Sequence, residues 1–301
     1  MLLMKKKIMN RVVERVLKVM SKNSPYKHIE KLEEKLENAR EQKVYNYRLP
    51  KNFKLKSEVE EFESFGIVFY RLRPKELRND KKIIYLHGGA YIEDMNKQHW
   101  IFIDGMVKKL GCEIILPMYP LTPFSNCSKT FEKMVLLYDD ITKNYKEEDI
   151  TLMGDSAGGG LVTSLAQYLR DTNKKSPSNI ILLSPWLDVS MENREMREIE
   201  YRDYILGVDS LKVCGKLWAN ELSVKDSKVS PIYGEFNGLG KISVFTGTND
   251  ILWFDAKRLK AILDKENIEF NYYEYEEMPH VFAILPIPQS DEVVEIVKNL
   301  I

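Results

Sequence analysis

Cysteine is scarce in this sequence, and neither sign of charge is in excess. The 301 residues include three cysteines, Cys112, Cys127 and Cys214, which are too few and too scattered for a disulfide framework or a thiolate metal site. They suit a reducing compartment, so we expect a cytoplasmic protein. Lys and Arg together number 45, as do Asp and Glu. A net charge of zero does not favour a nucleic-acid partner.

Long hydrophobic runs are also lacking. No apolar stretch approaches the roughly 18 residues that a membrane span needs. The first twenty residues, MLLMKKKIMNRVVERVLKVM, carry charges throughout, whereas a signal peptide needs an unbroken apolar segment. We therefore expect neither secretion nor stable membrane insertion.

The same N-terminal segment is locally basic and predicts an amphipathic helix. Seven Lys or Arg residues and one acid, Glu14, lie between Met1 and Ser24. Apolar residues recur at helical spacing opposite the basic ones, namely Ile8, Val12, Val16, Val19 and Met20. Such a helix either lies on a membrane surface or packs on its own protein. We expect the second, because YKHIEKLEEKLENAR follows as a mixed-charge helix able to pair with it.

Short β-branched runs alternate with helical patterns over most of the chain. After two strands around a turn at Gly66, the predicted strands are KKIIYLH, CEIILPMY, ITLMG, NIILLSPW, KISVFTG and FNYYEYEEM. Helical stretches separate them at Ile101–Leu110, Lys129–Tyr145, Leu161–Arg170 and Asp255–Lys265. Apolar strands alternating with helices are typical of a parallel sheet buried on both faces. The sequence therefore predicts an α/β fold in one large domain.

The alternation lapses between Val189 and Pro231. This segment is charged, it is predicted to be helical, and it follows a strand. Open α/β sheets bind ligands at the carboxyl ends of their strands, so we expect the insertion to lie near a ligand site.

One serine lies among four glycines in ITLMGDSAGGGL. Gly154, Ser156 and Gly158 match G-x-S-x-G between a predicted strand and a predicted helix, the context that a nucleophilic serine requires. Aiming the hydroxyl off the end of a sheet forces a strained turn, in which side chains two residues to either side would collide. A phosphate-binding turn is the alternative, but neither G-x-x-x-x-G-K-[ST] nor G-x-G-x-x-G is present.

A serine nucleophile needs a base, and the sequence has four histidines: His28, His87, His99 and His280. His280 is the best placed, because it follows both the serine and the last predicted strand. An acid is expected between serine and histidine in the chain. Asp250 closes the strand that directly precedes the one delivering His280, and we select it over Asp188, which follows another strand. A helix-start role accounts for Asp255.

The loop in YLHGGAYI follows another predicted strand and suits an oxyanion hole. Gly88 and Gly89 allow backbone N–H groups to approach a substrate, with Ala90 beside them, and the amide of Ala157 completes the set. His87 is then expected to stabilise the loop and not to act as a second base.

These motifs resemble those of the hormone-sensitive-lipase-like group of α/β-hydrolases, which includes bacterial carboxylesterases and acetyl esterases. The resemblance spans about residues 81–301 and rests on HGGAY, GDSAGG, SPWLD, SPIYG, GTNDIL and PHVF. It implies an α/β-hydrolase fold, with a mostly parallel central sheet flanked by helices and a helical cap. It also implies no metal or organic cofactor, the triad Ser156, Asp250 and His280, and an oxyanion hole at Gly88, Gly89, Ala90 and Ala157.

The resemblance further implies a domain organisation. Residues 1–50 would form N-terminal cap helices, and residues 51–301 the α/β-hydrolase domain with a cap insertion at about 189–230. Two departures concern the substrate. YPLTPF (Tyr119–Phe124) lacks the arginine and glutamate that the group often has there, so a role of those charges does not carry over. Ala90 stands where glycine is common, which keeps the N–H and adds a methyl group near the substrate.

We therefore predict a serine carboxylesterase that hydrolyses short-to-medium acyl esters through an acyl-enzyme intermediate. The charged insertion favours small soluble esters over oil interfaces. An amidase, formamidase or peptidase with the same triad stays open, since specificity depends on pocket shape. A non-catalytic binding protein of this fold would lack a triad member, and none is lacking. The expected partner is a small-molecule ester, and a homodimer is also left open.

Overall fold

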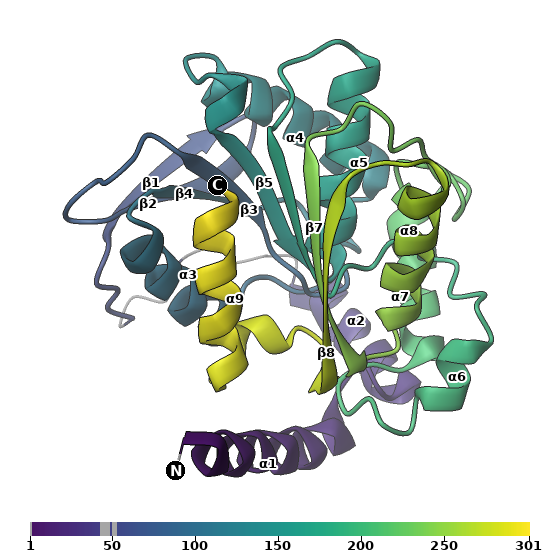
Figure 1. Ribbon diagram of the computed structural model, residues 1–301. Helices are drawn as coiled ribbons and strands as arrows, with labels where there is room; N and C mark the ends of the chain where they lie inside the picture. Colours follow the sequence, from purple (N-terminus) through teal and green to yellow (C-terminus); the bar gives the residue numbers. More distant parts are fainter. Residues whose placement is uncertain (1, 43–48, 50–52) are drawn as a thin grey trace.

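A twisted eight-stranded sheet forms the centre of the computed structural model, which describes residues 2–42, 49 and 53–301 (Figure 1). In the described residues the strand order is β1-β2-β4-β3-β5-β6-β7-β8. Strands β3 to β8 are parallel, whereas β2 is antiparallel to both β1 and β4. This confirms the predicted α/β fold with a mostly parallel sheet. The strands are β1 (Glu58–Ser64), β2 (Ile67–Arg73), β3 (Lys82–Leu86), β4 (Glu113–Pro117), β5 (Ile150–Asp155), β6 (Asn179–Leu183), β7 (Lys241–Asn249) and β8 (Phe270–Pro279).

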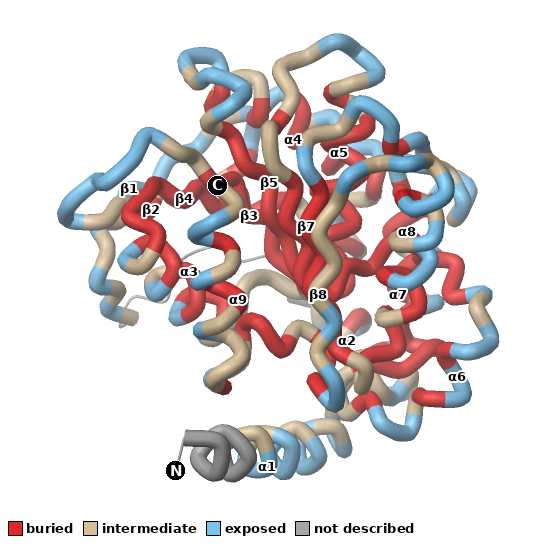
Figure 2. Tube along the Cα trace, in the orientation of Figure 1, coloured by how far each residue is buried: buried red, intermediate tan, exposed pale blue. Residues whose placement is uncertain are grey.

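Helices cover both faces of the sheet. Successive strand residues point to opposite faces, so each central strand contributes to two cores. In β3, Ile83 and Tyr85 belong to the core under α3 and α9, while Ile84 and Leu86 belong to the core under α4, α5 and α8. Figure 2 shows the central strands buried along their length. The helices are α1 (Leu2–Met20), α2 (Ile29–Gln42), α3 (Lys97–Leu110), α4 (Cys127–Thr142), α5 (Ala157–Asp171), α6 (Glu195–Ile199), α7 (Val208–Ala219), α8 (Trp253–Lys265) and α9 (Pro288–Leu300).

The insertion between β6 and β7 contains less helix than its charge pattern predicts. Within residues 189–230, all of them described, α-helix is confined to α6 and α7. The Asp203 side chain accepts hydrogen bonds from the amides of Ile205 and Leu206, a local turn that competes with helix.

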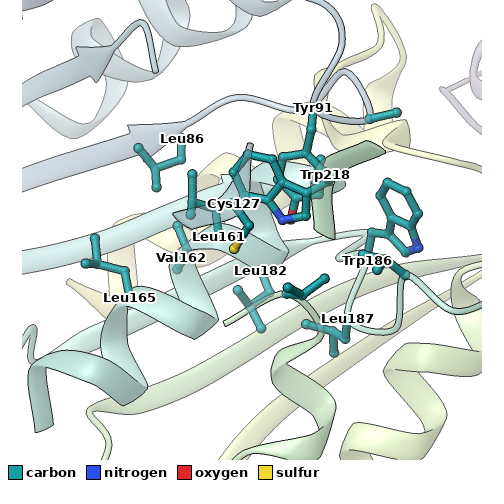
Figure 3. Close-up of a cluster of buried hydrophobic side chains, with 14 of the residues drawn as sticks. Leu86, Tyr91, Cys127, Leu161, Val162, Leu165, Leu182, Trp186, Leu187 and Trp218 are labelled. Carbon is teal, nitrogen blue, oxygen red and sulfur yellow. The ribbon is translucent and has the colours of Figure 1, made fainter. Parts of the chain in front are cut away.

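The insertion is nevertheless packed firmly onto the core. Trp218 of α7 stacks on Tyr91, with ring centroids 4.0 Å apart, and Tyr91 also packs on Trp186 (Figure 3). Both tryptophans are fully buried. The insertion, the loop after β3 and the segment after β6 are therefore joined by one aromatic stack.

Helix α1 does not pack on the protein through its apolar stripe, so our expectation was wrong. Val12, Val16 and Val19 are 49, 51 and 67% exposed, and α1 faces the body through Val13 and Leu17 instead. Helical periodicity identifies an apolar face but not what covers it.

The second N-terminal helix also differs from the expectation. Helix α2, expected to pair with α1, packs against α7, and its Leu32 and Leu36 are buried. The side chain of Ile8 and the expected domain boundary between residues 50 and 51 lie outside the described residues.

Candidate active site

Ser156 occupies a strained turn between β5 and α5. Its backbone has a φ of 50° and a ψ of −121°, which is uncommon for a residue with a side chain. The flanking glycines are needed for space. A Cβ at Gly158 would lie 2.0 Å from the carbonyl oxygen of Leu86, and one at Gly154 would lie 2.6 Å from the backbone of Gly158. The turn predicted from G-x-S-x-G is therefore present.

The chain segments after β7 and β8 bring an acid and a base to this serine. His280 Nε2 lies 2.9 Å from Ser156 Oγ, and His280 Nδ1 lies 2.8 Å from Asp250 Oδ2. The other carboxylate oxygen of Asp250 accepts the Leu252 amide at 2.8 Å, which orients the carboxylate. The three residues that the sequence selected as a triad thus lie together, and all three are buried.

These contacts determine how the imidazole shares its protons. A carboxylate only accepts hydrogen bonds, so Nδ1–H donates to Asp250, and Nε2 is left to accept from the Ser156 hydroxyl. Burial disfavours the charged ring, but the carboxylates of Asp250, Asp203 and Asp155 outweigh this effect. The pKa of His280 is therefore raised above its usual 6.5.

The rival acids belong to a separate cluster. Asp188 Oδ2 accepts from Tyr233 and Arg258 at 2.8 and 2.9 Å. Asp255 Oδ2 accepts the amides of Leu187 and Asp188, and burial next to Asp188 raises the pKa of Asp255 to about 8. Both carboxylates are thus engaged away from the candidate base.

Asp155, directly before the serine, holds the loop that follows β3, and the sequence analysis missed it. Its Oδ1 accepts the Tyr85 hydroxyl at 2.6 Å and the Gly88 amide at 2.9 Å, and its Oδ2 lies 3.2 Å from His99 Nε2. Burial alone would raise the pKa of Asp155, but His99 and these hydrogen bonds lower it. An acid at the buried end of an apolar strand was the available signal.

The bond between Gly88 and Asp155 corrects one predicted role. Because its N–H is occupied, Gly88 is not a free oxyanion donor. Glycine at position 88 instead allows the backbone to pass close to the Asp155 carboxylate, since a Cβ there would lie 2.3 Å from Asp155 Oδ2. The amides of Gly89, Ala90 and Ala157 donate to no acceptor within the described part of the chain. Gly89 and Ala90 have φ values of 117° and 50°, and Ala157 is the first residue of α5.

His87 lies in this loop and not beside the serine, as expected. Its ring stacks on Tyr119 with centroids 4.4 Å apart, and its Nδ1 lies 2.7 Å from the Gly88 carbonyl oxygen. Burial lowers the pKa of His87. The Tyr119 hydroxyl donates to the His87 carbonyl at 2.5 Å, and the Thr122 hydroxyl donates to the Tyr91 carbonyl at 2.8 Å. The segment Tyr119–Phe124 therefore stabilises the loop after β3 through hydrogen bonds from two neutral hydroxyl groups.

A second residue that the sequence analysis missed, Asp203, joins the insertion to the candidate acid. Its Oδ2 accepts the amide of Ile251, the residue after Asp250, at 2.9 Å. Its Oδ1 accepts the amides of Ile205 and Leu206 at 2.8 and 2.9 Å. Burial, followed by the charge of Asp250, raises the pKa of Asp203 to about 6. No pattern in the sequence distinguishes this acid from its charged neighbours.

Lys27, just before α2, fastens the same part of the insertion. Its Nζ donates to the carbonyl oxygens of Glu200, Asp203 and Leu206 at 2.6, 2.7 and 2.9 Å. The amide of Gly207 donates to the Tyr26 carbonyl at 2.7 Å. Partial burial lowers the pKa of Lys27. The N-terminal segment and the insertion are therefore joined next to the site.

A cavity of about 110 Å³ adjoins Ser156. Its lining comes from the N-terminal segment, the loop after β3, the insertion and the segment after β8, and it includes Tyr26, Gly89, Ala90, Ile205, Leu206, Val281 and Ile284. It shares Glu93, Asp94 and Asn96 with a larger cavity of about 730 Å³ beside α2. The serine is thus reached through a small pocket with one polar side and one apolar side.

Two features are absent from the described residues. No group of three or more His, Cys, Asp or Glu side chains there is placed to hold a metal ion. No helix in that part of the chain is both long and apolar enough to cross a bilayer.

Comparisons with known proteins agree with this fold. Residues 83–284 match a family described as alpha/beta hydrolase fold. An esterase of Acinetobacter venetianus is 25% identical over 204 residues, which cover 67% of each chain. A putative esterase from Staphylococcus aureus superposes with a TM-score of 0.87 at 26% identity, over 92% of this chain and 94% of that one. A hormone-sensitive lipase from a metagenome library has a TM-score of 0.83 at 20% identity, over 97% and 96%.

The family match covers most of the chain, from β3 to the segment after His280, and so includes Ser156, Asp250 and His280. The chain therefore belongs to the α/β-hydrolase fold family, and its resemblance to the hormone-sensitive-lipase-like group is confirmed.

Proposed function

We propose that this protein is a serine carboxylesterase in which Ser156 is the nucleophile, His280 the general base and acid, and Asp250 the group that orients the imidazole. One observation carries the proposal: Asp250, His280 and Ser156 form an unbroken hydrogen-bonded chain, with steps of 2.8 and 2.9 Å, in a buried site. Hydrolysis of carboxylic esters is also the activity named for its esterase relatives.

The proposed reaction proceeds in two halves. His280 Nε2 takes the Ser156 proton as Oγ attacks the ester carbonyl carbon, and the imidazolium then protonates the leaving alcohol. Water, deprotonated by the same nitrogen, attacks the acyl-enzyme, and His280 returns that proton to Ser156 Oγ as the bond to the acyl group breaks and the acid is released. The amides of Gly89, Ala90 and Ala157 are the proposed donors to the oxyanion, and Ala157 adds the positive end of the α5 dipole.

The proposed substrate is a small ester with a short-to-medium acyl chain. The cavity of about 110 Å³ beside Ser156 supports a small acyl group. The segment around Tyr26, α2 and the insertion at 189–230 form the proposed cap, since Tyr26, Ile205 and Leu206 line that cavity. A cytoplasmic location is also proposed, and three buried cysteines without a disulfide support it.

Hydrolysis of p-nitrophenyl esters from acetate to decanoate tests the proposal. We expect activity to fall as the acyl chain lengthens, and Ser156→Ala to lower kcat by about 10⁴-fold or more. Ser128→Ala, at an exposed position on α4, is the matched control and should leave kcat unchanged. If a folded protein cleaves no ester, the assignment fails. Cleavage of anilides alone would then indicate an amidase, and binding without turnover a non-catalytic protein.

A further inference from the structure

An uncovered apolar stripe runs along α1. It consists of Met9, Val12, Val16, Val19 and Met20, whose spacing of three and four residues places them on one side of the helix. Each is between 46 and 67% exposed. Isolated exposed apolar residues are common on proteins, whereas five on one helical face indicate an interaction surface.

The position of α1 keeps this stripe turned outward. Val13 packs against the core under α9, and Leu17 faces the ends of β7 and β8. Lys18 Nζ lies 5.8 Å from the ring centre of Tyr204 in the insertion. The helix is therefore held along one flank by Val13 and Leu17, while the adjoining flank presents Val12, Val16 and Val19 outward. Figure 1 shows α1 below the rest of the molecule, and Figure 2 shows exposed and intermediate residues along the part of α1 that it colours by burial.

The charge around the stripe identifies what it fits. Four basic residues of this segment are exposed, namely Arg11, Arg15, Lys18 and Lys22. Glu14 is the single acid in the first 24 residues. A second copy of the chain would oppose basic residues to basic residues across the paired stripes. A surface with anionic groups outside and an apolar interior would instead bury the valines and attract the basic side chains.

We propose that α1 docks the protein on an anionic lipid bilayer, with the apolar stripe at the level of the acyl chains and Arg11, Arg15 and Lys22 among the headgroups. The binding is peripheral and reversible, because α1 is amphipathic and does not cross the bilayer. It is independent of the proposed esterase chemistry, since no residue of the stripe lines the cavity beside Ser156.

Docking through α1 would also set the orientation of the site. A cavity of about 340 Å³ between α1 and the sheet is lined by Asn10, Glu14, Asn249 and Pro279. Asn249 and Pro279 directly precede Asp250 and His280 in the chain. The bilayer-bound helix would thus lie beside the edge of the sheet that carries the candidate active site.

Co-sedimentation of the full-length protein with vesicles tests this proposal. The vesicles are pure phosphatidylcholine, or phosphatidylcholine with one third phosphatidylglycerol. We expect binding to the anionic vesicles that weakens as salt rises, and little binding to the neutral ones. Neutralising two charges in Arg11→Gln/Arg15→Gln should weaken binding by about 25-fold, at about fivefold for each charge.

Val16→Asp should abolish binding, because it places a charge within the stripe. Leu77→Asp, at a residue 53% exposed in the loop after β2, is the matched control and should bind as the wild type does. Circular dichroism of each variant checks that the fold is intact. Absence of binding to anionic vesicles would overturn the proposal. Equal binding of Val16→Asp would also overturn it, as would a dimer in light scattering that Val16→Asp makes monomeric, which would assign the stripe to a second copy.

Discussion

At the scale of single residues, the protonation of His280 controls the proposed reaction. The ring must be neutral to accept the Ser156 proton, and the surrounding carboxylates raise its pKa above 6.5. We therefore expect kcat/KM to be low in acid, to rise as His280 loses its proton, and to level off at higher pH. A pH–rate profile with p-nitrophenyl acetate measures the midpoint, which should lie above 6.5.

Asp250 is the main source of that raised pKa after the opposing effect of burial. Asp250→Asn should move the midpoint to lower pH and reduce kcat by about 10⁴-fold, because the imidazole loses its orienting acceptor. Asp291→Asn, at a largely exposed position on α9, is the control and should leave both unchanged. A midpoint that stays in place in Asp250→Asn would contradict this account of His280.

Substitution of two helical glycines by alanine distinguishes a steric requirement for glycine from the general effect of helix propensity. A Cβ at Gly158 would lie 2.0 Å from the backbone oxygen of Leu86, so Gly158→Ala must displace the backbone and should cost several kcal/mol, on the order of 3 or more. A Cβ at Gly105, within α3, meets nothing within 4 Å. Gly105→Ala should therefore stabilise the fold by about 0.5–1 kcal/mol. Urea unfolding measures both, and equal effects would rule out the steric explanation.

At the scale of elements, the insertion is held beside the site by a few polar contacts. Lys27→Met keeps an unbranched side chain, one atom shorter, and removes the donor to three carbonyl oxygens, including that of Leu206. We expect a loss of about 1–3 kcal/mol in the free energy of unfolding. KM should rise more than kcat falls, because Leu206 lines the cavity beside Ser156.

Lys31→Met is the matched control for Lys27. Lys31 is exposed on α2 and pairs only locally, with Glu34. Its removal should change stability by less than about 0.5 kcal/mol. Equal effects of the two lysine substitutions would show that the contacts of Lys27 to the insertion do not matter.

The sequence predicted the central elements well and the peripheral ones poorly. Strands β3 to β7 are largely apolar and buried, and such runs have few structural alternatives to a buried parallel sheet. The stripe on α1 is an equally clear pattern, yet its described residues are exposed. Periodicity identifies an apolar face but does not predict which surface covers it. Asp155 and Asp203 escaped notice for a related reason, since their partners are backbone amides and residues distant in sequence.

At the scale of the whole molecule, all three thiols are sealed inside the fold. Cys112, Cys127 and Cys214 are fully buried, and burial raises the pKa of each to about 12. We expect the native protein not to react with Ellman's reagent. The unfolded protein should react at all three thiols and so produce three equivalents of thionitrobenzoate. A thiol that reacts rapidly in the native protein would mean that part of the core opens locally.

The order of Ser156, Asp250 and His280 along the chain, each after a predicted strand, predicts that their side chains lie together, and in the structure they do. Ser156, Asp250 and His280 each follow a parallel strand, and parallel strands deliver their carboxyl ends to one edge. The role of Gly88 was not predictable in this way, because it depends on a single hydrogen bond to a neighbouring strand. Topology places residues near one another, and individual contacts decide which atoms remain free.

The stacked rings of Trp218 and Tyr91 provide an intrinsic spectroscopic probe of the position of the insertion. The two rings are within 3° of parallel, and one belongs to the insertion while the other follows the proposed oxyanion donors. Two aromatic chromophores at 4.0 Å interact strongly, and their contribution to the near-ultraviolet circular dichroism depends on their separation and angle. Any ligand that lifts the insertion must part these rings, so the movement can be followed spectroscopically without a label.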